Sequence, residues 1–227
     1  MAALDSRAKR AFDIVIASLG LVLLIPVVLV VAVAIKVESR GSVFYRCRRV
    51  GYGRRELPML KFRKMRTDAA GPALTTAGDE RFTRIGRLLA ASKIDEIPQL
   101  WNVLKGEMSL VGPRPEDLVF VLLHEVEYAE ILRVKPGITG LSQLAFARES
   151  EILDPDRRID DYVTRLLPQK LSLDRLYVSR RSMAMDLRIV FWTIVVVVLR
   201  RRVAVHRVTA KLNLRRRPSV LTSAPIR

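Results

Sequence analysis

The chain of 227 residues has one cysteine, Cys47, and two histidines, and it lacks several common binding motifs. A single cysteine excludes an internal disulfide and a cysteine-based metal cluster. There is no GxxxxGK[ST] loop, no dinucleotide-binding fingerprint and no zinc-ligand spacing. Neither His124 nor His206 has an apparent catalytic partner in the sequence. Hydrophobic residues make up half of the chain, which also excludes an intrinsically disordered protein.

Acidic residues are scarce relative to basic ones, with 23 Asp and Glu against 40 Lys and Arg, a net charge of +17. The excess is concentrated in two blocks. Residues 40–66 carry ten Lys or Arg and one acid, and residues 200–227 carry nine Lys or Arg and no acid. This distribution indicates an anionic partner, and nucleic acid, anionic lipid and phosphorylated metabolites all fit it.

One long stretch has no charge at all: residues 14–35 are 22 uncharged, largely apolar residues. As a helix they would extend about 33 Å, enough to span a bilayer. Pro26 has no N–H to offer the carbonyl of Val22, so we expect a kink. Both flanks are basic, and basic flanks stay on the cytoplasmic side. A spanning helix remains the alternative, but a re-entrant helix that enters and leaves by the same face satisfies both flanks.

A second apolar run, residues 189–199, has 11 residues and is too short to span. It predicts either a core helix or an interfacial helix with Arg200, Arg201 and Arg202 at phosphate level. The basic tail beyond it contains Pro218 and Pro225, and we expect it to be mobile.

Two β-prone stretches, residues 42–48 and 57–65, flank Gly51-Tyr52-Gly53 and predict a hairpin. Its second half carries a group of basic side chains: Lys61, Arg63, Lys64 and Arg66. They form either a solvated basic face or a phosphate site. Residues 81–92 follow with an amphipathic helical pattern built on Phe82, Ile85, Leu88 and Leu89.

Asp95 and Glu96 precede a predicted helix that starts near Pro98 and ends at Gly106. Acids at this position can simply favour the helix dipole. Two adjacent carboxylates also repel each other, which favours a bound cation, and Mg²⁺ binds carboxylate and phosphate oxygens together. Farther on, Arg114 stands between two prolines, which restrict its backbone and would aim a guanidinium suited to phosphate.

Several segments together resemble the bacterial sugar transferase family, the monotopic phosphoglycosyl transferases. They are KRAFDIVIASLGLVLLIPVVL, VFYRCRRVG, LKFRKMRTDA, FTRIGRLL, KIDEIPQLWNVLKGEMSLVGPRPE, KPGITGLSQL and LDRLYVSRRSMAMDLRIVF, within residues 8–199. The chain resembles the minimal form of the family.

The resemblance implies an enzyme of the bacterial inner membrane with its catalytic part on the cytosolic face. It would transfer a sugar 1-phosphate from a UDP-sugar to undecaprenyl phosphate, with Mg²⁺, and release UMP in the first membrane step of polysaccharide or glycoconjugate synthesis. By this resemblance Asp95 is the nucleophile, Glu96 is a Mg²⁺ ligand, and Lys61 and Arg114 bind substrate phosphate. We assign Arg63 to the same phosphate-binding group.

Three positions depart from the family pattern. Ile25 stands where Ser is frequent before Pro26, Ala90 stands where many members have Arg, and Cys47 stands where many have Gln. Lys93, Arg87 or Arg84 are candidates to replace the missing arginine.

The expected architecture is mainly α-helical with a short β-hairpin. We predict a re-entrant, Pro26-kinked membrane helix over residues 1–38, a catalytic domain with interfacial amphipathic helices over 39–200, and a basic tail over 201–227. A homodimer is plausible, and nucleic acid is not an expected partner. Two alternatives are a non-enzymatic membrane adaptor that binds anionic lipid or nucleic acid, and a scaffold inactivated by Ala90.

Overall fold

The computed structural model describes residues 2–69, 71, 74–76, 78–154, 156–201 and 203–214, and side chains from residue 7 onward. The α-helices are α1 (Ala2–Glu38), α2 (Arg84–Ser92), α3 (Gln99–Lys105), α4 (Leu118–Leu123), α5 (Glu125–Ile131), α6 (Leu141–Ala145), α7 (Arg158–Asp161), α8 (Leu167–Arg180) and α9 (Met183–Val198). The strands are β1 (Phe44–Val50), β2 (Glu56–Phe62), β3 (Ser109–Val111), β4 (Gly137–Thr139), β5 (Val203–Val205) and β6 (Leu212–Leu214). A mainly helical fold with small two-stranded sheets is therefore confirmed.

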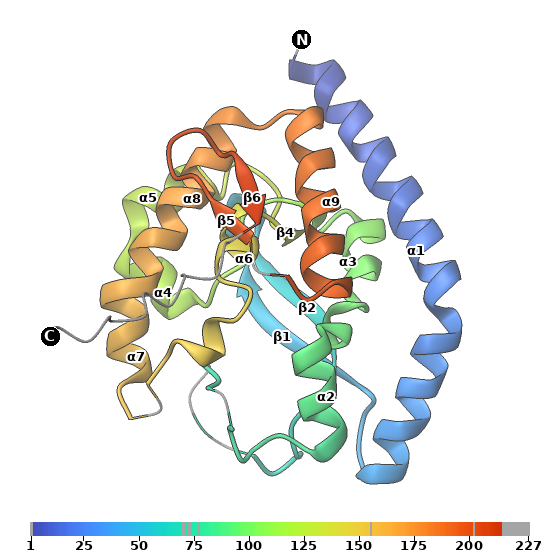
Figure 1. Cartoon of the computed structure of the whole chain (residues 1–227). Helices are drawn as coiled ribbons and strands as arrows, with labels where there is room; N and C mark the ends of the chain where they lie inside the picture. Colours follow the sequence, from blue (N-terminus) through green and yellow to red (C-terminus); the bar gives the residue numbers. More distant parts are fainter. Residues whose placement is uncertain are drawn as a thin grey trace, which may run out of the picture.

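Helix α1 lies along one side of the molecule, and the other elements form a body beside it (Figure 1). Within α1, Arg7–Glu38 is long and apolar enough to cross a membrane. The helix continues through Pro26, and Figure 1 shows gradual curvature in place of a break. The expected kink is therefore not confirmed. Pro26 removes one hydrogen bond within the helix. Contacts with the body at both ends of α1 keep the helix continuous in spite of this loss.

Near the N-terminus of α1, three polar side chains bind the body. Lys9 Nζ lies 2.6 Å from Asp186 Oδ2 of α9. Arg10 donates to the carbonyls of Val103 and Leu104 at 2.6 and 2.8 Å, which caps the C-terminus of α3. Asp13, buried, accepts from the Ser109 hydroxyl at 2.8 Å and from the Leu110 N–H at 3.1 Å.

The C-terminal end of α1 is held in the same way. Arg63 donates to the Ser39 carbonyl at 2.8 Å, to the Ser39 hydroxyl at 2.9 Å and to the Arg40 carbonyl at 2.5 Å. Glu38 in turn accepts from the N–H of Arg84 at 2.6 Å, at the start of α2. Both ends of α1 are thus bonded to one compact body.

The predicted hairpin is confirmed as β1 and β2, which pair antiparallel with Tyr45 opposite Lys61. Gly53 has φ +64° in the turn, a conformation that glycine adopts without a steric cost. A second pairing is parallel: β3 runs alongside β4, and Val111 is opposite Thr139. It brings the segment around Arg114 against the loop that follows Lys135.

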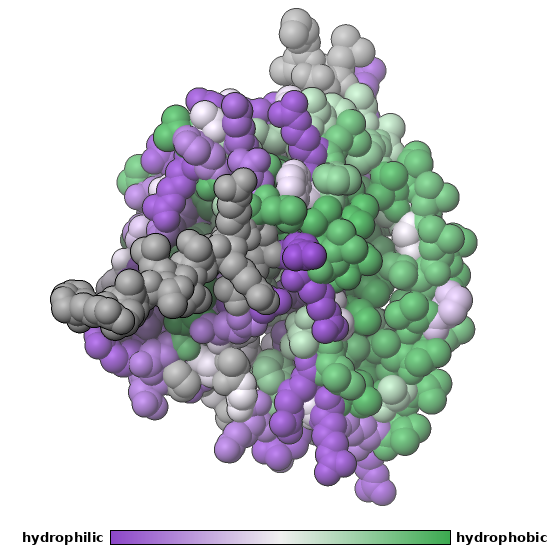
Figure 2. Space-filling model, in the orientation of Figure 1, coloured by the Kyte–Doolittle hydropathy of each residue, from purple (hydrophilic) through white to green (hydrophobic). Residues whose placement is uncertain are grey.

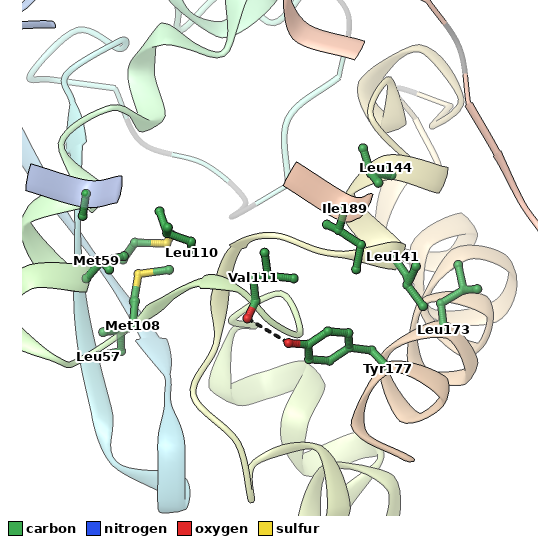
Figure 3. Close-up of a cluster of buried hydrophobic side chains, with 12 residues drawn as sticks. Leu57, Met59, Met108, Leu110, Val111, Leu141, Leu144, Leu173, Tyr177 and Ile189 are labelled. Atoms are coloured by element: carbon green, nitrogen blue, oxygen red, sulfur yellow. Dashed lines mark hydrogen bonds between the residues drawn. The ribbon is translucent and has the colours of Figure 1, made fainter. Parts of the chain in front are cut away.

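The core lies between β2, β3, α6, α8 and α9. Figure 3 shows Leu57 and Met59 of β2 and Met108 on one side, and Leu141, Tyr177 and Ile189 on the other. The Tyr177 hydroxyl donates to the Val111 carbonyl at 3.1 Å. This packing holds the β3 strand, and with it the loop that carries Arg114, in a fixed position.

Two predicted helices differ in detail from the structure. Helix α2 begins at Arg84 and not at Arg81, because Thr83 adopts an extended conformation and its hydroxyl caps the helix by accepting from the Gly86 N–H at 2.9 Å. Helix α3 begins at Gln99, after Pro98, and ends as predicted at Gly106, with φ +83°.

Large apolar side chains are exposed along α1 and α9. On α9 they include Phe191, Ile194 and Val198, whereas Ile189 is buried. Figure 2 shows an apolar surface that covers α1 and extends toward α9. The run at residues 189–199 therefore has two faces: Ile189 is buried in the core, with Val190, Trp192 and Val196 packed against it, and the exposed residues form an apolar surface.

Part of the predicted tail is folded. Residues 203–214 form the β5–β6 hairpin, with Val203 opposite Leu214, and β5 packs against α6. Apolar residues of the hairpin, such as Val205 and Leu212, pack against the main core cluster. This packing explains why the hairpin is folded, although the basic composition of the segment predicted a mobile tail. Pro218 and Pro225 lie outside the described residues.

Candidate active site

The adjacent acids Asp95 and Glu96 lie on a single 3-10 turn, Ile94–Glu96, directly before α3. The turn follows Lys93, whose φ of +62° places it in the left-handed region and reverses the chain at the end of α2. The Glu96 N–H bonds the Lys93 carbonyl at 3.2 Å. Asp95 is only 2% exposed, so this short turn holds a carboxylate rigidly inside the protein.

Each carboxylate has its own lysine. Lys64 Nζ lies 3.0 Å from Asp95 Oδ2, and Lys61 Nζ lies 3.0 Å from Glu96 Oε1. Both lysines come from the end of β2 or just after it, 31 and 35 residues before their partners. Charge-assisted hydrogen bonds of this length fix the orientation of the carboxylate oxygens.

Lys64 is held in place by a close backbone approach to α2. Its carbonyl accepts from the Thr83 N–H at 3.1 Å. A Cβ atom built on Gly86 would lie 1.8 Å from the same carbonyl oxygen. Only glycine allows α2 to pack this tightly, so Gly86 sets the position of the lysine that meets Asp95.

Arg114 approaches Glu96 from a third element. Its Nη2 lies 4.0 Å from Glu96 Oε1, and its side chain is 36% exposed. The supporting loop is pinned by backbone bonds, from Gly112 N–H to the Thr139 carbonyl and from Gly137 N–H to the Pro113 carbonyl, each at 2.9 Å. Burial disfavours the charged form of Glu96, but Lys61, Arg114 and Lys93 outweigh it and lower its pKa to about 2. Glu96 is therefore ionised at physiological pH.

Lys93 is the fourth cation of the group. The residue is exposed to solvent. Its position two residues before Asp95 makes it a candidate to contact an anion next to that carboxylate.

Behind Arg114 lies a buried polar network. Glu116 accepts a hydrogen bond from the Tyr162 hydroxyl. Lys170 donates to that hydroxyl at 2.8 Å and to Glu149 at 2.9 Å. Burial raises the pKa of Tyr162, which keeps it a hydrogen-bond donor. The sequence alone did not single out these residues, because they come from three separate segments.

These groups surround a cavity of about 570 Å³. Its lining includes the four cations and two acids just described: Lys61, Lys64, Lys93, Asp95, Glu96 and Arg114. Ala90 and Arg87 also line it. Lys93 and Arg87 are thus near the position where the family arginine is missing. The cavity holds a cationic rim around two carboxylates, which suits a ligand with several phosphate oxygens.

The structure brings Asp95, Glu96, Lys61 and Arg114 together, but not Arg63. Arg63 is buried at the C-terminus of α1, and it does not line the cavity of the described residues. In a regular strand Lys61 and Arg63 would point to the same face, because side chains alternate between the two faces. However, β2 ends at Phe62, so this alternation does not extend to Arg63. Lys64 takes the place that the sequence analysis gave to Arg63. The sequence signal for Lys64 was its place in the same basic segment as Lys61.

The described residues contain no group of three or more His, Cys, Asp or Glu side chains that could hold a metal ion. Two adjacent carboxylates nonetheless fit Mg²⁺, which is commonly bound by one or two carboxylates together with substrate phosphates and water. The donor set of Asp95 and Glu96 is of that kind.

Comparisons with known proteins identify similar chains. The model of a family described as bacterial sugar transferase matches residues 4–200. The chain is 41% identical over 199 residues to an undecaprenyl-phosphate glucose phosphotransferase of Komagataeibacter xylinus, covering 84% of this chain and 36% of the relative. It is 39% identical to a UDP-glucose:undecaprenyl-phosphate glucose-1-phosphate transferase of Caulobacter vibrioides, over 85% of this chain and 70% of the relative.

A third relative differs in the sugar that its name specifies. It is the UDP-N-acetylgalactosamine-undecaprenyl-phosphate N-acetylgalactosaminephosphotransferase of Aeromonas hydrophila, 38% identical over 82% of this chain and 42% of the relative. The chain thus spans less than half the length of two of these three relatives.

Proposed function

Because the chain belongs to the bacterial sugar transferase family, we propose that it transfers a sugar 1-phosphate from a UDP-sugar to undecaprenyl phosphate and releases UMP. The names of the similar proteins support this reaction. The structural observation that carries it is the buried Asp95 carboxylate, held by Lys64 at the wall of a cation-lined cavity. The names of the similar proteins specify glucose in two cases and N-acetylgalactosamine in the third. We therefore propose a UDP-hexose as the donor of this chain, without naming the hexose.

In the proposed first step, an Asp95 oxygen attacks the phosphorus that bears the sugar. The bond from that phosphorus to the UMP oxygen breaks, and the bonding electrons leave with UMP. In the second step an oxygen of the lipid phosphate attacks the same phosphorus, and Asp95 departs as a carboxylate. Splitting one transfer into two displacements is the usual advantage of a covalent intermediate.

Charge repulsion is the main obstacle to the first step. Two unit charges 4 Å apart interact by about 4 kcal/mol at an effective dielectric near 20, and a carboxylate must approach a diphosphate. Lys64 and Lys61 lie next to the two carboxylates, and Arg114 lies close to Glu96. Their positive charges offset the repulsion and stabilise the leaving phosphate.

Mg²⁺ belongs to the same proposal. Glu96, with Asp95 beside it, would hold the ion together with the substrate phosphates. When bound, Mg²⁺ supplies Lewis-acid stabilisation of the phosphate oxygens.

The proposal also includes the membrane arrangement. We place α1 in the cytoplasmic membrane with both ends on the cytosolic face. The bonds of Lys9 and Arg10 at one end, and of Arg63 at the other, support this arrangement because they join both ends to one body. Cysteines introduced by Ser6→Cys and Ser42→Cys, each in a Cys47→Ser background, should react with an impermeant reagent from the cytosolic side only. Labelling from opposite sides would establish a spanning helix instead.

The reaction is tested with lipid-reconstituted protein, Mg²⁺, undecaprenyl phosphate and several UDP-hexoses. UMP release and a phosphosugar adduct on Asp95 by mass spectrometry are expected. Asp95→Asn should abolish both while leaving the fold intact. An adduct that persists in Asp95→Asn would contradict the assignment of the nucleophile, and absence of UMP release with every donor would contradict the proposed function.

A further inference from the structure

Lys170 is a buried lysine that the proposed mechanism does not use. Its side chain is 4% exposed. Its Nζ atom donates to Glu149 Oε2 at 2.9 Å and to the Tyr162 hydroxyl at 2.8 Å, and it lies 3.8 Å from Glu116 Oε2. A buried charge is costly unless it is paired. This lysine thus stands between two carboxylates at the wall of the candidate active-site cavity.

The position of Lys170 is fixed by the elements around it. Leu166 and Leu167, just before it in the chain, are buried in one hydrophobic cluster together with Tyr162. Tyr162 opens a single π-helical turn directly before α8, and such turns are rare and frequent at functional sites. The Lys170 ammonium lies 4.5 Å from the centre of the Tyr162 ring, a favourable cation–π contact. The lysine and the phenol therefore form one rigid unit.

This unit provides hydrogen-bond partners for both carboxylates. Glu116 accepts from the Asp117 N–H at 3.0 Å through Oε1 and from the Tyr162 hydroxyl through Oε2. Glu149 accepts from Lys170. The hydroxyl has one proton, which it donates to Glu116 while it accepts from Lys170. The charge of the lysine therefore supports both acids, one directly and one through the phenol.

Arg114 lies beside the same two carboxylates. Its guanidinium interacts electrostatically with Glu149 and Glu116 as well as with Glu96. Among the described residues, its ion pair is with Glu96, at 4.0 Å. A guanidinium near a carboxylate readily forms two short, parallel hydrogen bonds with it. In this structure Arg114 is not held in that way, and its side chain remains open to an anion in the cavity.

We infer that Lys170 is a positioning residue for Arg114. It binds Glu149 directly and Glu116 through the Tyr162 hydroxyl. Without it the two carboxylates would bind the neighbouring guanidinium, and Arg114 would no longer reach a substrate phosphate. This inference rests on the proposed function, which gives Arg114 its phosphate-binding role, and it adds that Lys170 supports this binding without contacting the substrate.

The test measures binding of UDP with Mg²⁺ to the full chain in nanodiscs, by isothermal titration calorimetry, so that no turnover is required. Lys170→Met should weaken UDP binding about tenfold or more, the loss expected when one charged hydrogen-bonding group leaves a phosphate. The matched control is Arg175→Met. It removes a cation from the same helix that pairs with Glu130 outside the cavity, and it should bind UDP as the wild type does.

A double-mutant cycle with Arg114→Met separates positioning from a general loss of stability. If Lys170 acts through Arg114, adding Lys170→Met to Arg114→Met should cause no further loss of UDP affinity. Losses that multiply in the double variant would overturn the inference, because they would show that the lysine acts independently of the arginine. An unchanged UDP affinity in Lys170→Met would also overturn it.

Removal of one carboxylate provides a rescue experiment. Lys170→Met/Glu149→Gln should bind UDP more tightly than Lys170→Met, because one of the two acids that compete for Arg114 is gone. A purely structural role of the lysine predicts recovery of the unfolding temperature without recovery of UDP affinity. That result would overturn the inference.

Tyr162→Phe keeps the inference testable if Lys170→Met does not fold. This variant removes the hydroxyl that Glu116 accepts from, while the pair of Lys170 and Glu149 remains. It should weaken UDP binding in the wild-type background and have no effect in Arg114→Met. Equal losses in both backgrounds would contradict a role through Arg114.

The outcomes separate this inference from the proposed function. If the wild type and variants show the expected cycle with UDP but no UDP-hexose yields UMP, the reaction is wrong and the role of Lys170 stands. If UMP is released but the two losses multiply, the reaction stands and the inference is overturned. A wild type that does not bind UDP would remove the phosphate-binding role of Arg114, and the inference with it.

Discussion

Lys64 and Asp95 form an ion pair, with 3.0 Å between Nζ and Oδ2, although 31 residues separate them in the chain. The aspartate is almost entirely buried, and the lysine side chain is about a quarter exposed toward the cavity. The lysine therefore orients the carboxylate and faces whatever approaches it. This pair is the centre of the proposed chemistry.

Replacing Lys64 by methionine should slow the first displacement about 100-fold, the order expected when one preorganised charge is lost from a reacting centre. The burst rate of UMP release measures this step. Lys64→Arg should recover part of the rate, because it restores the charge.

Lys105→Met is the control, since Lys105 is an exposed lysine paired with Glu107 at the end of α3. A Lys64→Met protein with an unchanged burst rate would show that the ion pair is structural and not catalytic.

Glu96→Gln should raise the Mg²⁺ concentration needed for half-maximal rate about tenfold or more, because one carboxylate ligand is lost. Titrating Mg²⁺ at saturating donor measures the shift. Glu56→Gln, at the far end of the hairpin in an exposed pair with Arg48, should leave the titration unchanged. An identical Mg²⁺ requirement in Glu96→Gln would remove Glu96 from the metal site.

Arg63→Met should reduce stability without affecting the chemistry of the remaining folded protein. It leaves the carbonyls of Ser39 and Arg40 without their donor, and a lost charged hydrogen bond costs about 1.5–3 kcal/mol. Thermal unfolding measures the effect, with Arg48→Met, exposed on β1, as control. A normal unfolding temperature combined with a raised KM for donor would instead support the phosphate-binding role that the sequence suggested.

Gly86→Ala should destabilise the protein by about 3 kcal/mol and lower activity, because the new methyl group cannot coexist with the Lys64 carbonyl 1.8 Å away. Unfolding and UMP release should be affected together. Gly20→Ala is a suitable comparison: its Cβ would lie 3.2 Å from the movable Leu100 side chain. Equal and small effects of both substitutions would contradict the close approach of α2 to Lys64.

Asp174 should make stability depend on pH. Burial raises its pKa from 3.8 to about 7, although a hydrogen bond from Ser142 opposes the shift. Between about pH 4 and pH 7 the folded state therefore holds a proton that the unfolded state has released. Stability from this group is fully present below pH 4 and declines as pH rises toward 7.

Asp174→Asn should flatten the plot of unfolding free energy against pH across this range. The exposed Asp68 shows no comparable burial, so Asp68→Asn should leave the slope as it is in the wild type. A slope that persists in Asp174→Asn would assign the pH dependence to another group.

The sequence by itself determined the elements whose cause is local. A charge-free run of 22 residues has to form an apolar helix, and glycine between two β-prone stretches closes the hairpin. Pro98 and Gly106 bound α3, which leaves Asp95 and Glu96 directly before it. The seven sequence segments within residues 8–199 indicated the family, and the family model that matches residues 4–200 shows it.

The tertiary structure alone decided which cations meet the acids. Alternation along β2 stops at Phe62, so three neighbouring basic residues separate: Lys61 to Glu96, Lys64 to Asp95, and Arg63 to the end of α1. It also decided that residues 203–214 fold, because their apolar side chains find a core built from distant segments. Such contacts join residues tens of positions apart, and their free energy depends on packing that no local pattern encodes.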